Sequence, residues 1–301
     1  MIESLKLAAL ARNERLAVFH LSRLDQVAAE LSDFAAQEEL NGFQQWIVAH
    51  KYRLAPPADL PFTPRSILLQ AIPHPFYANV TVEHGGQEFQ LRCLVRAGFD
   101  AAEAWLRAEL HAAGYHLAAD PNLPFKRLGS HSLAAYGRNN ITYIEGLGSN
   151  FSYAGYFTDL DAAEDDWLPQ ARVAALCQTC KACLAACPTG AIRAERFLID
   201  NERCLSYFNE VPDPFPAWIQ PEWHNSVYDC LLCQQACPMN HGHLAPAAQT
   251  YRFDEAISAA ILAGDPLEAF PPAFQSDART LGLDEWWPAI GKNVRALIGD
   301  Q

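Results

Sequence analysis

The most informative stretch of this chain is CQTCKACLAACPTGAI, residues 177–192. It places four cysteines at intervals of three, three and four residues, and proline follows the fourth. Three thiolates at this spacing can hold three corners of one 4Fe-4S cube, while a fourth cysteine before proline binds a neighbouring cube. A tetrahedral zinc site uses two separated pairs of cysteines and has no role for a third one so close. The spacing therefore predicts iron–sulfur chemistry.

A second cysteine segment, CLLCQQACP, occupies residues 230–238, and Cys204 stands alone between the two segments. Division into two groups of four uses all eight of these cysteines. The groups are Cys177, Cys180, Cys183 and Cys237 for one cluster, and Cys187, Cys204, Cys230 and Cys233 for the other. The ninth cysteine, Cys93, has no His or Cys near it in sequence, so we expect a buried structural thiol there.

The composition is that of a globular protein with an acidic surface. The chain has 301 residues, of which half are hydrophobic, and its formal net charge is -13. Such a charge repels phosphate backbones, so nucleic acid is expected to be an unlikely partner and a small-molecule substrate is favoured. No window of about eighteen apolar residues predicts a membrane span. The charged N-terminal segment does not resemble a signal peptide, which predicts a cytoplasmic protein with reduced thiols.

Periodicity predicts an α+β protein in three segments. Residues 1–165 read as an α/β sandwich, with a buried strand in RSILLQAIPHP (65–75) and a β-hairpin around Gly85 and Gly86. Residues 166–249 form the ferredoxin-like double-cluster module. Residues 250–301 form a short tail with two helical stretches. A double-cluster ferredoxin alone is much shorter than this chain, so the first segment is expected to have a separate function.

Several of these motifs resemble the epoxyqueuosine reductases and the related reductive dehalogenases. The isolated cysteine between CxxCxxCxxxCP and CxxCxxxCP is similar to their double-cluster arrangement. Upstream, SILLQAIPHP (66–75) and AAYGRNNITYIEGLGSNFSYAGYFTDL (134–160) resemble two further stretches of those enzymes. The resemblance covers about residues 65–245. It implies a nitroreductase-like α/β domain that binds cobalamin beside the nearer cluster, which feeds single electrons to the cobalt.

The resemblance also implies cofactor-binding residues. Gly137, Arg138, Asn139 and Asn140 match the loop that borders corrinoid and substrate in that family. A glycine permits close backbone approach to a flat macrocycle, and guanidinium and amide groups can bind its side-chain amides. The plain alternative is a turn, because Gly and Asn are common turn residues.

Two features depart from the family pattern. Epoxyqueuosine reductases place a proton-donating aspartate shortly before this loop, whereas AADPNLP brings Asp120 near that place but out of register. We therefore name Asp120 and Tyr143 as candidate catalytic proton donors. The chain also ends soon after Cys237, without the helical-repeat extension often found in family members that act on tRNA.

The sequence thus favours a cytoplasmic, corrinoid-dependent iron–sulfur oxidoreductase. In this interpretation two 4Fe-4S clusters relay electrons from an external donor such as ferredoxin or flavodoxin to a small-molecule substrate in the first segment. Two alternatives stay open. One is a ferredoxin-type electron-transfer protein without corrinoid, and the other is an epoxyqueuosine reductase that acts on tRNA.

Overall fold

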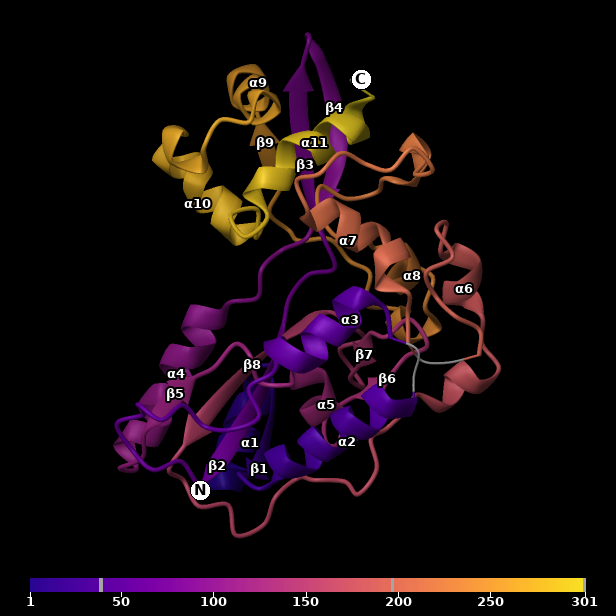
Figure 1. Ribbon diagram of the computed structural model, residues 1–301. Coiled ribbons are helices and arrows are strands. Elements are labelled where there is room, and N and C mark those ends of the chain that lie inside the picture. Colours follow the sequence, from indigo (N-terminus) through magenta and orange to yellow (C-terminus); the bar gives the residue numbers. More distant parts are fainter. Residues whose placement is uncertain (38–39, 196–197, 300–301) are drawn as a thin grey trace. The chain divides into compact units, whose positions relative to one another are not determined.

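The computed structural model describes residues 1–37, 40–195 and 198–299 (Figure 1). The chain forms two compact units, and each contains two separate stretches of sequence. The first unit consists of residues 1–73 and 97–179, and the second consists of residues 74–96 and 180–301. Within the described residues, no helix has the length and apolar character needed to cross a membrane.

The first unit is built on a four-stranded antiparallel sheet. Its strands, in spatial order, are β1 (Arg15–His20), β2 (Ser66–Pro73), β8 (Phe151–Thr158) and β5 (Leu117–Ala119). Strand β2 is the buried strand that the run RSILLQAIPHP predicts, and only its last residue is partly exposed. A strand in the middle of a sheet that is covered on both faces is apolar at consecutive positions, which explains this run.

Helices cover both faces of this sheet. Leu16 and Leu68 pack with the helices α1 (Ile2–Ala11) and α4 (Phe99–Ala112), whereas Phe19 and Ile67 pack on the opposite face with α2 (Arg23–Gln37). Successive residues of a strand point to opposite faces, so one short apolar strand serves two cores. The other elements of the unit are α3 (Gly42–Trp46), a π-helical turn (Ile47–Lys51), α5 (Phe125–Ser130), β6 (Ala135–Tyr136), β7 (Thr142–Tyr143) and a 3₁₀ turn (Ala175–Gln178).

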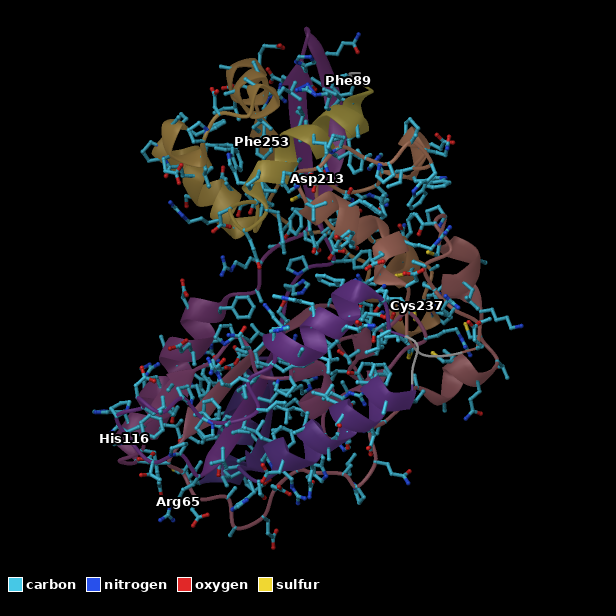
Figure 2. The ribbon with its side chains drawn as sticks, in the orientation of Figure 1. Arg65, Phe89, His116, Asp213, Cys237 and Phe253 are labelled. Carbon is cyan, nitrogen blue, oxygen red and sulfur yellow. The ribbon has the colours of Figure 1, made fainter. Side chains whose placement is uncertain are left out.

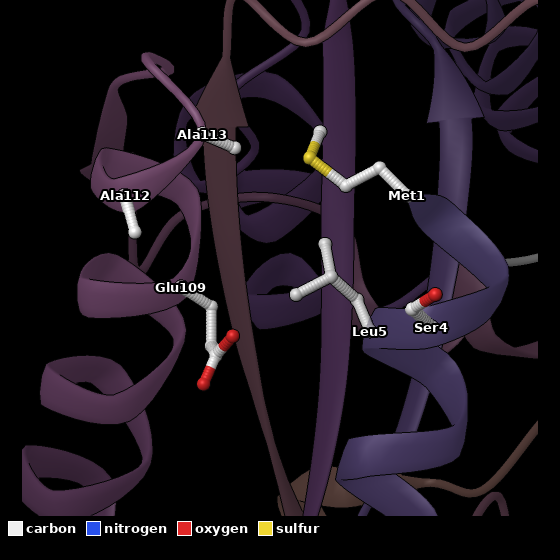
Figure 3. A pocket seen from close by; sticks show the side chains of 6 residues that line it. All are labelled: Met1, Ser4, Leu5, Glu109, Ala112 and Ala113. Atoms are coloured by element: carbon white, nitrogen blue, oxygen red, sulfur yellow. The ribbon is translucent and has the colours of Figure 1, made fainter.

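A cavity of about 250 Å³ lies in the first unit beside α1 and α4 (Figure 3). Its lining consists of Met1, Ser4, Leu5, Glu109, Ala112 and Ala113. This lining is mostly apolar and contains none of the candidate site residues, so the cavity takes no part in the site below.

The second unit contains a three-stranded sheet in the order β4 (Gln87–Cys93), β3 (Ala78–His84) and β9 (Tyr251–Phe253). Strands β3 and β4 form the predicted hairpin, and its two turn glycines both have positive φ. Such backbone angles suit a two-residue hairpin turn, which is why glycines occur there. Alternate residues of β3 are buried, so the strand has one core face.

The helices that cover this sheet come from the C-terminal part of the chain: α9 (Glu255–Ala263), α10 (Pro272–Thr280) and α11 (Trp287–Ile298). Phe253, labelled in Figure 2, packs against Phe274 of α10 in the same core. The hairpin therefore belongs with the C-terminal helices, and this division differs from the expected boundary near residue 165. The reason is that the apolar face of the hairpin packs against residues far away in sequence, and local periodicity does not show such long-range contacts.

The remaining elements of the second unit are short; all lie in the cysteine segment or directly after it, except the last, which lies between α9 and α10. They are α6 (Ala182–Ala186), α7 (Leu205–Glu210), α8 (Leu232–Gln235) and 3₁₀ turns at Asn201–Arg203, Pro221–Trp223, Pro238–Asn240 and Leu267–Ala269. The α+β class is confirmed. The nitroreductase-like description of the first unit stays a prediction.

Candidate functional site

Two short helices of the second unit carry cysteines and pack against each other. Cys183 lies in α6 and Cys233 lies in α8. Cys183 is buried, and so is Cys237, which is labelled in Figure 2. None of the nine cysteines, all of which lie in the described residues, forms a disulfide. Soft thiolate donors of this kind suit iron–sulfur clusters.

Three cysteines of the second predicted cluster interact electrostatically. Burial raises the pKa of Cys204, and it raises the pKa of Cys230 to about 12. The Cys187 thiol raises the pKa of Cys204 further, and the Cys204 thiol does the same to Cys230. The structure thus brings together three residues that the sequence assigns to one cluster. Buried thiols resist ionisation on their own, and a bound metal centre supplies the positive charge that stabilises thiolates.

Polar side chains hold the segment around Cys230. Asn225 Nδ2 donates to the Cys230 Sγ over 3.3 Å, and its Oδ1 accepts from the Leu231 N–H over 3.0 Å. Asp229 Oδ1 accepts from the Cys230 N–H over 2.7 Å, and Asp229 has a φ of 59°. Asn and Asp tolerate this left-handed conformation better than most residues. Neither residue was predicted from the sequence, because the only signal was an Asn or Asp shortly before a CxxC pair.

Within residues 1–37, 40–195 and 198–299, no three His, Cys, Asp or Glu side chains are arranged to hold a single metal ion. A zinc site requires such an arrangement, with sulfur about 2.3 Å from the ion. A 4Fe-4S cluster makes a different demand, because its four thiolates bind four separate irons.

In the first unit, Arg138 is directed to a predicted cluster ligand. The residue is only 8% exposed, and Nη2 donates to the backbone oxygen of Cys177 over 2.6 Å. The sequence predicts Arg138 as a corrinoid-binding residue. The geometry shows that the guanidinium supports the backbone of Cys177.

The rest of this loop is a tight turn between β6 and β7. The Gly137 N–H donates to the Ile141 oxygen over 2.7 Å, and a Cβ at Gly137 would lie 2.6 Å from a ring carbon of Tyr143. Asn139 Nδ2 donates to the Tyr143 hydroxyl over 2.9 Å, so two predicted site residues meet. Asn140 has a φ of 59° and remains partly exposed. Glycine is therefore needed at position 137 because any larger side chain would collide with the Tyr143 ring.

Asp120, the other candidate proton donor, lies just after β5. Its Oδ2 accepts from Arg53 Nε over 2.9 Å, and its Oδ1 accepts from the Asn122 N–H over 2.9 Å. Asp120 as a whole is 5% exposed. An ion pair and a turn hydrogen bond are thus its contacts in this structure, and catalytic roles for Asp120 and Tyr143 stay predictions.

Comparison with known proteins identifies the cysteine segment. Residues 176–240 match a family model described as a 4Fe-4S double cluster binding domain. An epoxyqueuosine reductase from Burkholderia pseudomallei is 29% identical over 246 residues, which cover 76% of this chain and 59% of that protein. The match supports the expectation of two 4Fe-4S clusters. The chain spans less than two thirds of the length of that relative.

Solved structures show the same fold. The epoxyqueuosine reductase of Streptococcus thermophilus has a TM-score of 0.67 at 14% identity, over 100% of this chain and 82% of that chain. An epoxyqueuosine reductase solved with an epoxyqueuosine-modified tRNA stem loop has a TM-score of 0.64 at 17% identity, over 95% of this chain and 77% of that chain.

These findings overturn one expectation. The predicted small-molecule substrate, with nucleic acid as an unlikely partner, is wrong, because the matched proteins are epoxyqueuosine reductases and one of them was solved with a tRNA stem loop. The error came from the net charge of -13, which is a sum over the whole chain. A local surface can attract a phosphate backbone on a protein that is acidic as a whole.

The motifs around the cysteines, the double-cluster match and the fold agree with one another. The chain is therefore similar to epoxyqueuosine reductases over most of its length, and it contains a region that matches a 4Fe-4S double cluster binding domain.

Proposed function

We propose that this protein is an iron–sulfur reductase of the epoxyqueuosine reductase type, which acts on a modified nucleoside in tRNA. The observation that carries the proposal is the eight-cysteine segment, which matches a double-cluster domain within a chain similar to epoxyqueuosine reductases over most of its length. The corresponding reaction removes the epoxide oxygen as water and consumes two electrons and two protons. Single-electron centres are suited to deliver those electrons in two steps.

The eight cysteines would hold the two clusters in the sets derived from their spacing. Bound 4Fe-4S clusters supply electrons one at a time. The side chains around them keep the ligands in place. Arg138 holds the backbone of Cys177, and Asn225 donates to the sulfur of Cys230. Hydrogen bonds to cluster sulfurs tune the reduction potential, so Asn225 also acts on the electronics of its cluster.

A corrinoid bound beside the loop at residues 137–143 is part of the proposal. The partly exposed Asn140 is the loop residue best placed to bind the amide side chains of a corrinoid. The Lys126 ammonium supports the turn, since it donates to the Asn140 oxygen over 3.0 Å. Arg138 and Asn139 are buried and support the loop from within.

Replacement of Asn140 by glycine is expected to weaken cobalamin binding about fivefold, because a neutral hydrogen bond contributes about 1 kcal/mol. Glycine keeps the positive φ of 59° without strain, so the turn should persist. Absorption titration of reconstituted protein with cobalamin measures the change. Asn13→Gly is the matched control, since Asn13 also has a positive φ, of 62°, and lies in a turn outside the loop. Equal weakening in both variants would contradict the corrinoid site.

The tRNA proposal is tested with anaerobically reconstituted protein, dithionite and a tRNA stem loop that carries epoxyqueuosine. We expect the modified nucleoside to lose the mass of one oxygen atom, as measured by mass spectrometry of the digested RNA. A stem loop that already carries queuosine is the control and should not change. If protein with both clusters leaves the epoxide intact with and without cobalamin, the tRNA proposal is contradicted and the electron-transfer alternative is favoured.

A further inference from the structure

The C-terminal helix α11 holds the end of α7 through a lysine. Lys292 Nζ donates to the backbone oxygens of Phe208, Val211 and Asp213 over 2.7, 2.7 and 2.9 Å. It also lies 4.0 Å from the centre of the Phe215 ring. Burial lowers the pKa of Lys292 to about 8, while the Asp213 carboxylate raises it. The side chain is therefore an ammonium at pH 7, with three donors for three acceptors.

A second contact from α11 continues to the cysteine segment. Asn293 Nδ2 donates to the Asn209 oxygen over 2.7 Å, and Asn209 Nδ2 donates to the Asp229 oxygen over 2.6 Å. Asn293 and Asn209 are 1% and 0% exposed. Because both amide nitrogens face carbonyl oxygens, the orientation of each amide is determined. The route from α11 to Asp229 thus consists of buried hydrogen bonds.

The first turn of α7 borders predicted ligands of one cluster. Cys204 is the residue directly before α7, and Ser206 in its first turn donates from Oγ to Asp229 Oδ1. The same Asp229 oxygen accepts from the Cys230 N–H over 2.7 Å. The backbones at Cys204 and Cys230 are therefore joined through α7 and Asp229, and α11 holds α7 in place.

Among the described residues, the Oδ1 atoms of Asn209 and Asn293 are buried without a hydrogen-bond partner. A buried polar atom without a partner lowers stability, so stability alone does not explain these two amides. The hydrogen bonds that the two amide nitrogens donate give another reason why asparagine occurs at both positions. Buried polar networks restrict a structure to one arrangement of its parts.

We propose that Lys292 and Asn293 are positioning residues for the cluster assigned to Cys187, Cys204, Cys230 and Cys233. Acting through α7 and Asn209, they fix the separation of the Cys204 and Cys230 backbones and thereby set the stability and reduction potential of that cluster. The inference rests on the proposed cluster assignment and on nothing that concerns the substrate. Loss of the contacts should leave the ligands in place but let their backbones relax.

Lys292→Met is the main test, because its side chain keeps much of its apolar length and loses the three donors. We expect a chelator to remove iron from this cluster at least tenfold faster. We also expect about a tenfold change in its equilibrium constant for reduction, which for a one-electron couple is about 59 mV. EPR-monitored titration measures the potential, and comparison with Cys204→Ala shows which signal belongs to this cluster. Asn293→Leu should act in the same direction.

Arg295→Met is the matched control. Arg295 also lies in α11 and donates to a backbone oxygen, but its acceptor is Leu262 of α9. This variant should keep both potentials and the rate of iron loss, even if its melting temperature falls. Equal effects of Lys292→Met and Arg295→Met, equal effects on both clusters, or unchanged potentials in Lys292→Met would overturn the inference. Wild-type protein that reconstitutes no iron would overturn the proposed function itself, and the inference with it.

Discussion

Replacement of Cys204 by alanine is expected to lower the iron content of anaerobically reconstituted protein from about eight to about four per chain. Cys204 is predicted to bind the second cluster and is coupled electrostatically to Cys187 and Cys230, so its loss would leave that cluster with three of its four predicted ligands. The other cluster, assigned to Cys177, Cys180, Cys183 and Cys237, should remain. Iron and sulfide analysis, together with EPR of the reduced protein, measures the result.

Cys93→Ala is the matched control for this experiment. Cys93 is fully buried in the core of the second unit, and burial raises its pKa far above the ordinary range. The same chemical change should therefore leave iron content at about eight per chain. The reciprocal variant Cys237→Ala should remove the other cluster and spare the one held by Cys204. The cluster assignment is wrong if Cys204→Ala and Cys237→Ala abolish the same EPR signal.

Replacement of Arg138 by alanine is the second change for which we expect a large effect. The guanidinium is buried and donates to the Cys177 oxygen over 2.6 Å. Loss of a hydrogen bond from a charged group costs about 1.5–3 kcal/mol, so the cluster that Cys177 is predicted to hold should lose iron at least tenfold faster. Timed release of iron to a chelator, followed by EPR of the remaining cluster, measures the effect.

Two further variants test whether the effect depends on the geometry of the Arg138 guanidinium or on the loss of any arginine. Arg138→Lys keeps the charge but loses the planar fork, and we expect an intermediate rate of iron loss. Arg193→Ala removes an arginine from an exposed ion pair with Glu195 and should change little. Unchanged iron release in Arg138→Ala, combined with weaker cobalamin binding, would show instead that Arg138 serves the corrinoid directly.

The elements that follow from local pattern could be predicted from the sequence. The apolar run at 66–73 is strand β2, the glycines at 85 and 86 form the hairpin turn, and the stretch around DEAISAAILAG is α9. Helix α9 also has a local start and stop, since Asp254 accepts from the Ile257 N–H and Gly264 adopts a left-handed conformation. Periodicity and capping depend on neighbouring residues, so the sequence reports them directly.

The contacts that support the candidate site could not be predicted in this way. Arg138 contacts the Cys177 backbone, Asn209 contacts Asp229, and Lys292 reaches the end of α7. Each bond joins residues at least 20 positions apart in sequence. Every residue has a backbone oxygen, so the residue type does not show which of these oxygens will accept a hydrogen bond. No motif could therefore have indicated these acceptors.

The sequence by itself determined the metal chemistry of this protein, because cluster ligation depends on sulfur donors and their spacing along a short segment. Tertiary structure alone decided which segments belong together. The hairpin at 74–96 packs with α9, α10 and α11, and Arg138 turns to the predicted ligand Cys177. The physical reason is that a local sequence pattern shows that a face is apolar or that a backbone oxygen can accept a hydrogen bond, but it does not show which distant residue will contact it. Partners are selected only when the whole chain buries its apolar surface and satisfies its hydrogen bonds together.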